Sequence, residues 1–152
     1  MVADQIAEAN IPVIMDPIYN LPTAYENLGA RLDNAALLHK SGVQLIFTGM
    51  GWHNTHSAYL VRQSAGNAVT NGLPKEVAIA AITSSPAEIF QIGHSGKIRE
   101  GEKANFVLWS GDPLEVTSEA ELVMISGEEI VMESRSLQLR DRYFNSIKNE
   151  LK

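Results

Sequence analysis

The sequence predicts an α/β fold, with two parallel strands and their helices first, then a small β portion and a C-terminal helix. Two short apolar runs, 11–15 and 43–47, are separated by a segment with helical signals, which is the pattern of a βαβ unit. After residue 93 the helical periodicity stops and strand-like runs replace it. We therefore divide the chain into an α/β portion (1–93), a β portion (94–134) and a C-terminal segment (135–152).

The α/β portion opens with a short helix and a strand. Residues 2–9 carry Ile6 and Ala9 on one helical face, but no capping residue precedes them. They are either the end of a helix from a longer chain or a frayed terminus. The run Ile11–Met15 is typical of a strand buried on both faces, with Pro12 at its start, where a missing N–H matters least.

A helix over residues 24–40 is expected to connect the two strands. Thr23 and Glu26 have the spacing of a capping box, and Ser41-Gly42 supplies a stop. The expected apolar stripe consists of Leu28, Leu32, Ala35 and Ala36. With the second strand at 43–47, the unit is predicted to be a parallel, right-handed crossover.

Three further helices complete the α/β portion. One is expected over 58–71, ending at Asn71-Gly72, and the next begins at Leu73-Pro74 with proline in its first turn. Ser85-Pro86-Ala87-Glu88 has the form of a second capping box, which would start a short helix that ends at Gly93.

The remaining residues predict three strands and a final helix. The strands are expected at 106–109, 122–125 and 129–132, the last two joined by a hairpin at Ser126-Gly127. Residues 137–151 form an amphipathic pattern; its apolar members are Leu139, Tyr143, Phe144, Ile147 and Leu151.

Composition excludes several classes of protein. The chain has 152 residues, 45% of them hydrophobic, so it can build a core, and its formal net charge of −6 includes no basic stripe for nucleic acid. It has no cysteine, which excludes disulfides and thiolate metal sites. No apolar run approaches the roughly 20 residues of a membrane span, and Met1–Gln5 lacks the features of a signal peptide. We expect a soluble chain with neither membrane nor nucleic-acid partners, in a compartment that the sequence leaves open.

The stretch LIFTGMGWHNTHS, residues 45–57, contains the candidate site residues. A strand ends there and is followed by Trp52, His53, Asn54 and His56, which we predict to contact substrate. His53 and His56 could share one face of a turn and bind a metal, but two histidines alone make a weak zinc site. Two polar loop residues at the mouth of a site are the alternative, and Trp52 either lines that mouth or packs.

Asp16 is a second candidate, because it ends the first predicted strand. It is either a functional carboxylate or a turn-forming residue before Pro17. His39 and His94 are expected at the surface or in caps. We predict no catalytic residue and no metal ligand in this chain.

The most specific motif lies within residues 77–114. Thr83-Ser84-Ser85-Pro86-Ala87 is followed by Gly96-Lys97-Ile98, Gly101, Ala104-Asn105-Phe106-Val107 and Asp112-Pro113-Leu114. This series resembles the C-terminal end of the amidohydrolase superfamily, in the imidazolonepropionase-like and Xaa-Pro-dipeptidase-like branch. The glycines would allow tight turns, Ala104 would fit where strands pack closely, and Asp112-Pro113 would start a turn, so we expect these residues to be structural.

The resemblance implies the C-terminal portion of a (β/α)8 barrel, with residues 43–47 as its eighth strand, plus part of a small β-sandwich-like domain. Such barrels bind one or two divalent metals (zinc, iron or manganese) through an H-x-H pair, further histidines and an aspartate after strand eight. This sequence has no H-x-H, and Gly49 or Met50 holds the place of the aspartate. We therefore expect no metal in this chain, although the family implies one.

Three hypotheses follow. The chain is the C-terminal fragment of a hydrolase that acts on C–N bonds, lacks the N-terminal barrel half and is inactive alone. Alternatively, it belongs to a metal-free binding or structural barrel descended from that family, or it is an independent small α/β ligand-binding domain. Half a barrel leaves strand edges and apolar faces exposed, so we also expect self-association into dimers or higher oligomers.

Overall fold

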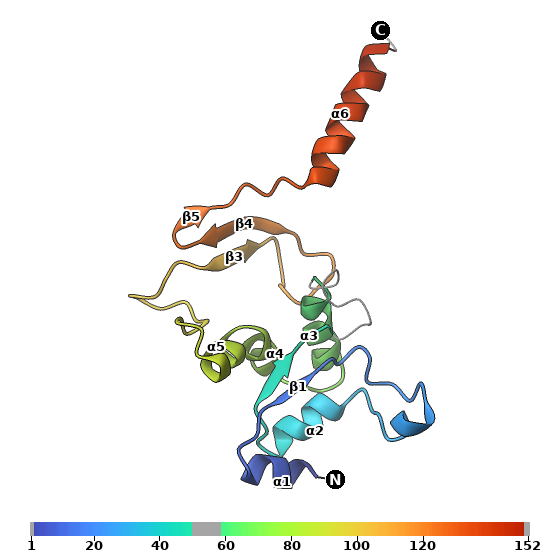
Figure 1. Cartoon of the computed structure of the whole chain (residues 1–152), viewed down its shortest axis with the longest axis vertical. Helices are drawn as coiled ribbons and strands as arrows, with labels where there is room; N and C mark the ends of the chain where they lie inside the picture. Colours follow the sequence, from blue (N-terminus) through green and yellow to red (C-terminus); the bar gives the residue numbers. More distant parts are fainter. Residues whose placement is uncertain (1, 50–58, 151–152) are drawn as a thin grey trace.

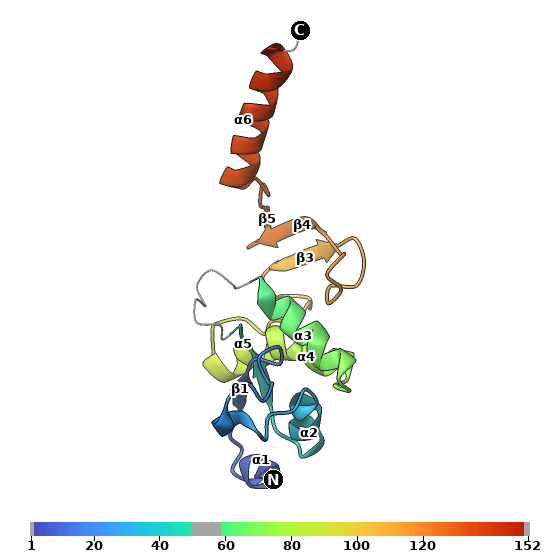
Figure 2. The same ribbon diagram turned by 90° about the vertical axis from the view of Figure 1, so that its right-hand side faces the viewer.

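The computed structural model describes residues 2–49 and 59–150, without the side chains of 145–150. Its α/β portion lies at one end of an elongated molecule, the small antiparallel sheet follows, and the last helix stands away from both (Figures 1 and 2). Along its long axis the molecule therefore shows three successive regions.

Two parallel strands form the centre of the first region. After helix α1 (Ala3–Glu8), strand β1 (Val13–Met15) pairs in parallel with β2 (Leu45–Phe47), so that Ile14 lies opposite Ile46. This confirms the parallel βαβ unit. Both strands are shorter than the apolar runs that predicted them, and all three residues of β2 are buried, as in a strand covered on both faces. The prediction that the first strand is buried on both faces is wrong, because no described element covers the side of β1 where Ile14 is 51% exposed.

The connecting helix is much shorter than predicted. Residues 25–27 form a 3-10 turn, and helix α2 begins only at Asn34 and ends at Lys40. The proposed capping box is wrong, since no side chain caps the turn, and Leu28 of the expected stripe is 67% exposed. The Asn20 amide donates to the Arg31 carbonyl, and the Arg31 guanidinium makes two 2.7 Å bonds to the Asp33 carboxylate. Residues two apart do not face each other on a helix, so this pair favours the loop.

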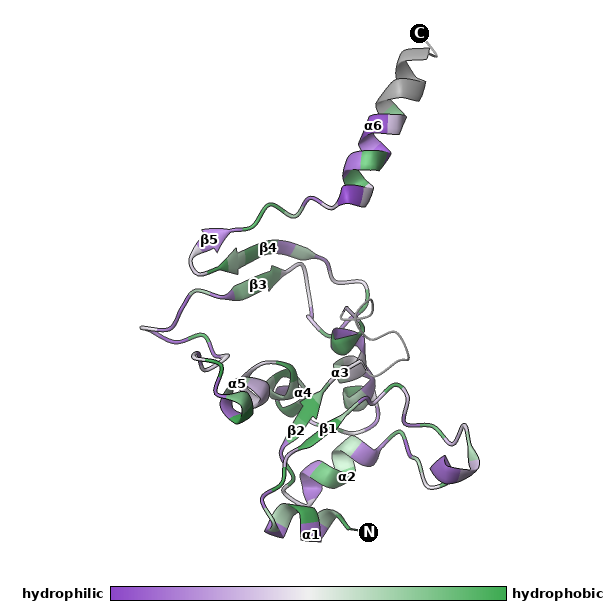
Figure 3. Ribbon diagram, in the orientation of Figure 1, coloured by the Kyte–Doolittle hydropathy of each residue, from purple (hydrophilic) through white to green (hydrophobic). Residues whose placement is uncertain are grey.

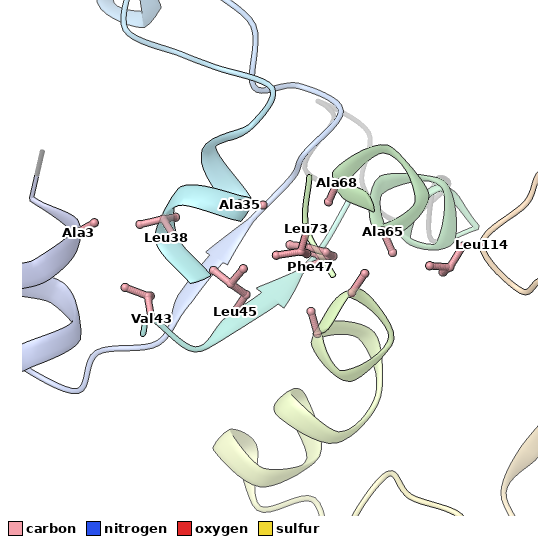
Figure 4. Close-up of a cluster of buried hydrophobic side chains, with 12 residues drawn as sticks. Ala3, Ala35, Leu38, Val43, Leu45, Phe47, Ala65, Ala68, Leu73 and Leu114 are labelled. Atoms are coloured by element: carbon pink, nitrogen blue, oxygen red, sulfur yellow. The ribbon is translucent and has the colours of Figure 1, made fainter. Parts of the chain in front are cut away.

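Three helices pack beside β2 and complete the core. They are α3 (Leu60–Thr70), α4 (Lys75–Ile82) and α5 (Ser84–Phe90), and all three contact β2. Figure 4 shows Leu38 of α2, Leu45 and Phe47 of β2, and Ala65 and Ala68 of α3 among the buried side chains of this cluster. The predicted stop after α3 is confirmed, with Gly72 at φ 98°.

Helix α5 forms without the predicted cap. Its N-cap residue is Thr83, which makes no capping bond, so Ser85 lies inside the first turn and cannot cap the helix. The Thr83 hydroxyl instead donates to the Ile79 carbonyl, 2.7 Å away in the preceding helix. Because α4 and α5 are separated by a single residue, the cap position falls two residues earlier than the sequence pattern predicts.

The second region is an antiparallel sheet in the order β3-β4-β5. Its strands are β3 (Phe106–Trp109), β4 (Ala120–Ile125) and β5 (Glu128–Glu129). Ser126 and Gly127 have φ values of 54° and 85°, which confirms the tight hairpin with two left-handed central residues. The strand predicted over 129–132 is shorter in the structure, since β5 ends at Glu129. One further hydrogen bond, from the Ile130 N–H to the Val123 carbonyl, follows it.

The third region is helix α6 (Arg135–Glu150), close to the predicted range of 137–151. Figure 3 shows apolar and polar residues alternating around its first turns. Within the described part of the chain, no helix is long and apolar enough to cross a membrane.

Candidate functional site

The carboxyl ends of β1 and β2 form the candidate site, because functional groups of parallel α/β folds gather at that edge. Asp16 directly follows β1, and Thr48 directly follows β2. The Thr48 N–H donates to the Met15 carbonyl at 3.0 Å, so the ladder continues for one residue beyond the strands. The sheet register thus places Asp16 and the Thr48-Gly49 segment at the same edge.

Asp16 is held in place by two neutral donors. Its Oδ1 accepts a 3.0 Å bond from the Ile18 N–H and a 2.9 Å bond from the Ser64 hydroxyl. The side chain is only 9% exposed, and Ser64 is fully buried on α3. The bond from Ile18 closes the turn that the Asp16-Pro17 sequence predicts. The bond from Ser64 connects the end of β1 to α3. Asp16 therefore has a structural role, which the turn interpretation covers only in part.

The resemblance assigns an aspartate to the position of Gly49 or Met50, after β2. Gly49 is buried there, and a glycine supplies neither a carboxylate nor a proton acceptor. Met50 lies outside the described residues, as do the four predicted substrate contacts Trp52, His53, Asn54 and His56. Those four assignments remain predictions.

The described residues do not provide a metal site. Among residues 2–49 and 59–150, no three His, Asp or Glu side chains lie close enough together to hold an ion. At the strand ends, Asp16 Oδ1 accepts hydrogen bonds from the Ile18 N–H and the Ser64 hydroxyl among the described groups. We therefore derive no chemical step through a metal. His39 is half-buried in the last turn of α2, and His94 Nδ1 accepts a 3.2 Å bond from the Gly96 N–H, in agreement with the local roles expected for both.

The motif residues build the junction with the small sheet. Gly96 has φ +64°, and a Cβ there would lie 2.6 Å from the Thr83 carbonyl oxygen, so a glycine is required. The Asp112 carboxylate accepts a 3.0 Å bond from the Leu114 N–H, which forms the predicted turn. Ala104 is exposed, contrary to the expectation of close strand packing, because only its carbonyl meets the hairpin, where it accepts from the Gly127 N–H.

Arg62 is the most connected residue that sequence reasoning missed. From the first turn of α3 it donates to the carbonyls of Pro113, Glu115 and Ser118 at 3.0, 2.8 and 3.2 Å. Its guanidinium also lies 4.5 Å from the centre of the Trp109 ring. One side chain thus joins α3 to β3 and to the loop that follows it. A lone arginine in an amphipathic helix gives no signal of this role.

A second polar contact supports the same junction. Lys75, at the start of α4, forms an ion pair with Asp112. The hydrogen bond from Lys75, together with that from the Leu114 N–H, lowers the pKa of the Asp112 carboxyl. Helix α3 also lies close to the loop around Leu114: a Cβ added to Gly66 would lie only 2.6 Å from the Leu114 carbonyl oxygen.

An apolar groove of about 1020 Å³ separates α4 and α5 from the sheet. Helix residues Ile79 and Ile82 line one side, and Val107, Trp109 and Val123 line the other. A smaller, polar pocket of about 400 Å³ lies beside the Lys75–Asp112 pair. Neither hollow includes Asp16, Thr48 or Gly49, so neither coincides with the strand-end site.

Comparison with known proteins supports the resemblance found in the sequence. The profile of the amidohydrolase family matches residues 22–131. Amidohydrolase tasK of Hapsidospora irregularis is 40% identical over 57 residues, which cover 37% of this chain and 6% of that protein. The crystal structure of an amidohydrolase from Thermotoga maritima MSB8 matches with a TM-score of 0.74 and 28% identity, over 87% of this chain and 34% of that one. The chain therefore spans only about a third of the solved relative, and it belongs to the amidohydrolase family.

Proposed function

We propose that this chain forms the closing part of an amidohydrolase-type (β/α)8 barrel and part of its small β domain. In this proposal β2 is the eighth barrel strand, and the whole protein hydrolyses C–N bonds in cyclic amides or dipeptides. The parallel β1–β2 pair, with helices after each strand, supports the barrel assignment. The substrate class is an extension from the branch that the sequence resembles.

We also propose that the isolated chain is not catalytic, and one observation carries this point. The described strand-end groups are a buried glycine after β2 and an aspartate whose Oδ1 bonds to Ile18 and Ser64. Metal-dependent hydrolysis needs a bound water and a base that accepts its proton. Amidohydrolases generally depend on a divalent metal (zinc, iron or manganese), and we expect its ligands to lie mainly in the part of the fold that this chain does not span.

A metal-free binding or structural barrel is the second candidate. Gly49 at the end of β2 favours it, since the resemblance places a ligand and proton acceptor there. A longer reading frame that encodes an H-x-H pair upstream would support the hydrolase, and a longer frame without that pair would support the binding barrel. The third candidate, an independent ligand-binding domain, must account for the many exposed apolar side chains, such as Ile98 and Val131.

The test is the metal content of the purified 152-residue chain, measured by elemental analysis after dialysis without chelator. Hydrolysis of a cyclic amide and of an Xaa-Pro dipeptide is measured on the same samples. A His53→Ala/His56→Ala variant tests the candidate site, and a His39→Ala/His94→Ala variant is the matched control, because it removes two histidines elsewhere.

We expect far less than one metal ion per chain, and no hydrolysis above background, in all three proteins. Near-stoichiometric metal in the wild type and the control, lost in the His53→Ala/His56→Ala variant, would overturn the proposal that the chain alone holds no metal. Hydrolysis with the same pattern would show that the chain assembles a complete active site.

A further inference from the structure

Helix α6 presents an apolar surface that none of the other described residues covers. Leu137 and Phe144 lie seven residues apart on one row of the helix, and Leu139 and Tyr143 lie four apart on the adjoining row. Tyr143 and Phe144 are 62% and 63% exposed. Figures 1 and 2 show that the helix extends away from the sheet, so these side chains face no other part of the body.

The small sheet has an apolar surface that is likewise uncovered. Val107, Trp109 and Val123 line the groove toward α4, whereas the cross-strand partners Leu108 and Leu122 do not line it. Successive side chains of a strand alternate between faces, so Leu108 and Leu122 belong to the opposite, outer face. Leu108 is 52% exposed there.

The two segments that contain these surfaces have opposite net charges. Residues 104–134 contain seven acidic residues and no basic one. Residues 135–150 contain four basic and two acidic residues, a net charge of +2. Arg140, which pairs with Asp141, lies on the same half of α6 as the four apolar side chains, and Glu128 and Glu129 form β5 at the edge of the sheet.

We propose that α6 of one chain docks on the outer face of the β3–β5 sheet of a second copy, and that the exchange is reciprocal. The lengths agree, since a helix of 16 residues is about 24 Å long and a strand of six residues about 20 Å. Two identical helix–sheet contacts then form a closed, two-fold dimer. Apolar burial stabilises the contact, and the charges orient it.

The geometry favours a second copy over the same chain or a membrane. Ile130 still bonds to Val123 of β4, and the chain then passes along the sheet to α6, which extends beyond it (Figure 1), so a partner can meet the helix without any change in this link. Docking within one chain would require the link to reverse. An anionic membrane surface would repel the acidic residues 104–134 that adjoin the helix.

A charge-exchange experiment tests docking between chains. One full-length variant carries Arg140→Glu in α6, and the other carries Glu128→Lys and Glu129→Lys in β5. In a dimer of either variant alone, charges of the same sign face each other at both helix–sheet contacts and repel. In a heterodimer of the two variants, charges of opposite sign face each other at both contacts and attract. Light scattering and native mass spectrometry measure the oligomeric state over roughly 1–100 µM, where dimers of ordinary affinity dissociate.

We expect a wild-type dimer, at least tenfold weaker self-association of each variant, and heterodimers in the mixture. A Tyr143→Gln/Phe144→Gln variant should also weaken the dimer at least tenfold, whereas Arg142→Glu, on the opposite half of α6, should not. A monomeric wild type overturns the proposal, as do variants that remain dimeric. If the mixed variants stay monomeric, the helix docks within its own chain, and the proposal is overturned. If the wild type binds phosphatidylserine vesicles but forms no dimers, the partner is a membrane, and the proposal is also overturned.

Discussion

The α/β region and the small sheet differ in how deeply their residues are buried. Every residue of β2 is buried, whereas none in β3, β4 or β5 is. The buried hydrophobic side chains of the described residues come from positions 3–87, with the single exception of Leu114. Leu114 lies not in the sheet but in the loop that contacts α3.

This difference shows that the sheet is attached to the α/β region mainly through one loop. Arg62, Gly66 and Lys75 contact the segment 112–118, whereas an apolar groove separates α4 and α5 from the sheet itself. A sheet whose faces are not buried cannot be stabilised by its own core, so its position depends on the loop contacts. Substitutions at the loop should therefore loosen the sheet, while those within the α/β core should act on the other region.

Replacing Arg62 with methionine should have the largest effect. The variant leaves three carbonyls without their donor and removes the contact with Trp109. All three bonds come from Nη1, which carries two hydrogens, and the bond to Glu115 is exposed to water, so we expect a loss of about 2–3 kcal/mol. Urea unfolding followed by Trp fluorescence measures the change. Arg99→Met, at an exposed position, is the control and should stay within about 0.5 kcal/mol of the wild type.

The Gly66→Ala substitution tests the closeness of the same junction. Alanine is the better helix former by about 1 kcal/mol, but its Cβ would meet the Leu114 carbonyl oxygen at 2.6 Å. The loop must then move, and we expect a net destabilisation of about 2 kcal/mol. Gly29→Ala is the matched control, since no atom lies within 4 Å of its added Cβ. Equal stability of Gly66→Ala and the wild type would show that the loop is not held against α3.

Ser64→Ala acts within the α/β region and should leave the sheet unaffected. It removes the 2.9 Å bond from a fully buried hydroxyl to Asp16. A lost bond to a buried carboxylate should destabilise the chain by about 1.5–2 kcal/mol. Hydrogen exchange should show faster opening of β1 and α3 but unchanged protection in β3 and β4. Faster exchange in all of these elements would mean that the two regions unfold as a single unit.

The sequence predicted the elements whose signals are local. The apolar runs that predicted β1 and β2, the Ser126-Gly127 hairpin and the glycine stop after α3 depend on neighbouring residues, and the structure confirms each. The prediction of a helix over 24–40 was wrong for residues 28–33. Hydrogen bonds of Arg31 with Asn20 and Asp33 favour a loop there, and Asn20 lies outside the segment that carries the helical pattern. Capping patterns identify helix starts only when no such contact offers the backbone another partner.

The site was predicted less completely. Asp16 was predicted to be either a functional carboxylate or a turn-forming residue. The turn is present, but the bond from Ser64 to Asp16 spans 48 residues and has no local signal. Arg62 was missed for the same reason, because its three acceptors are backbone carbonyls, which every residue possesses. The motif of residues 77–114 identified the family without identifying chemistry, since the described motif residues form turns and the junction.

The smallest expected effect is the pH dependence of the Lys75–Asp112 pair. The pair lowers the pKa of Asp112 in the folded chain, so its contribution to stability is full above the ordinary value of about 3.9 and is lost as pH falls through the lowered pKa. The Lys75 and Asp112 side chains are 43% and 33% exposed, which keeps the effect small. A double-mutant cycle with Lys75→Met and Asp112→Asn, in urea at low salt, should show a coupling at pH 7 that vanishes once Asp112 is protonated. A coupling that persists in acid would be apolar rather than ionic, and the loop would then be attached by packing, much as the core of the α/β region is.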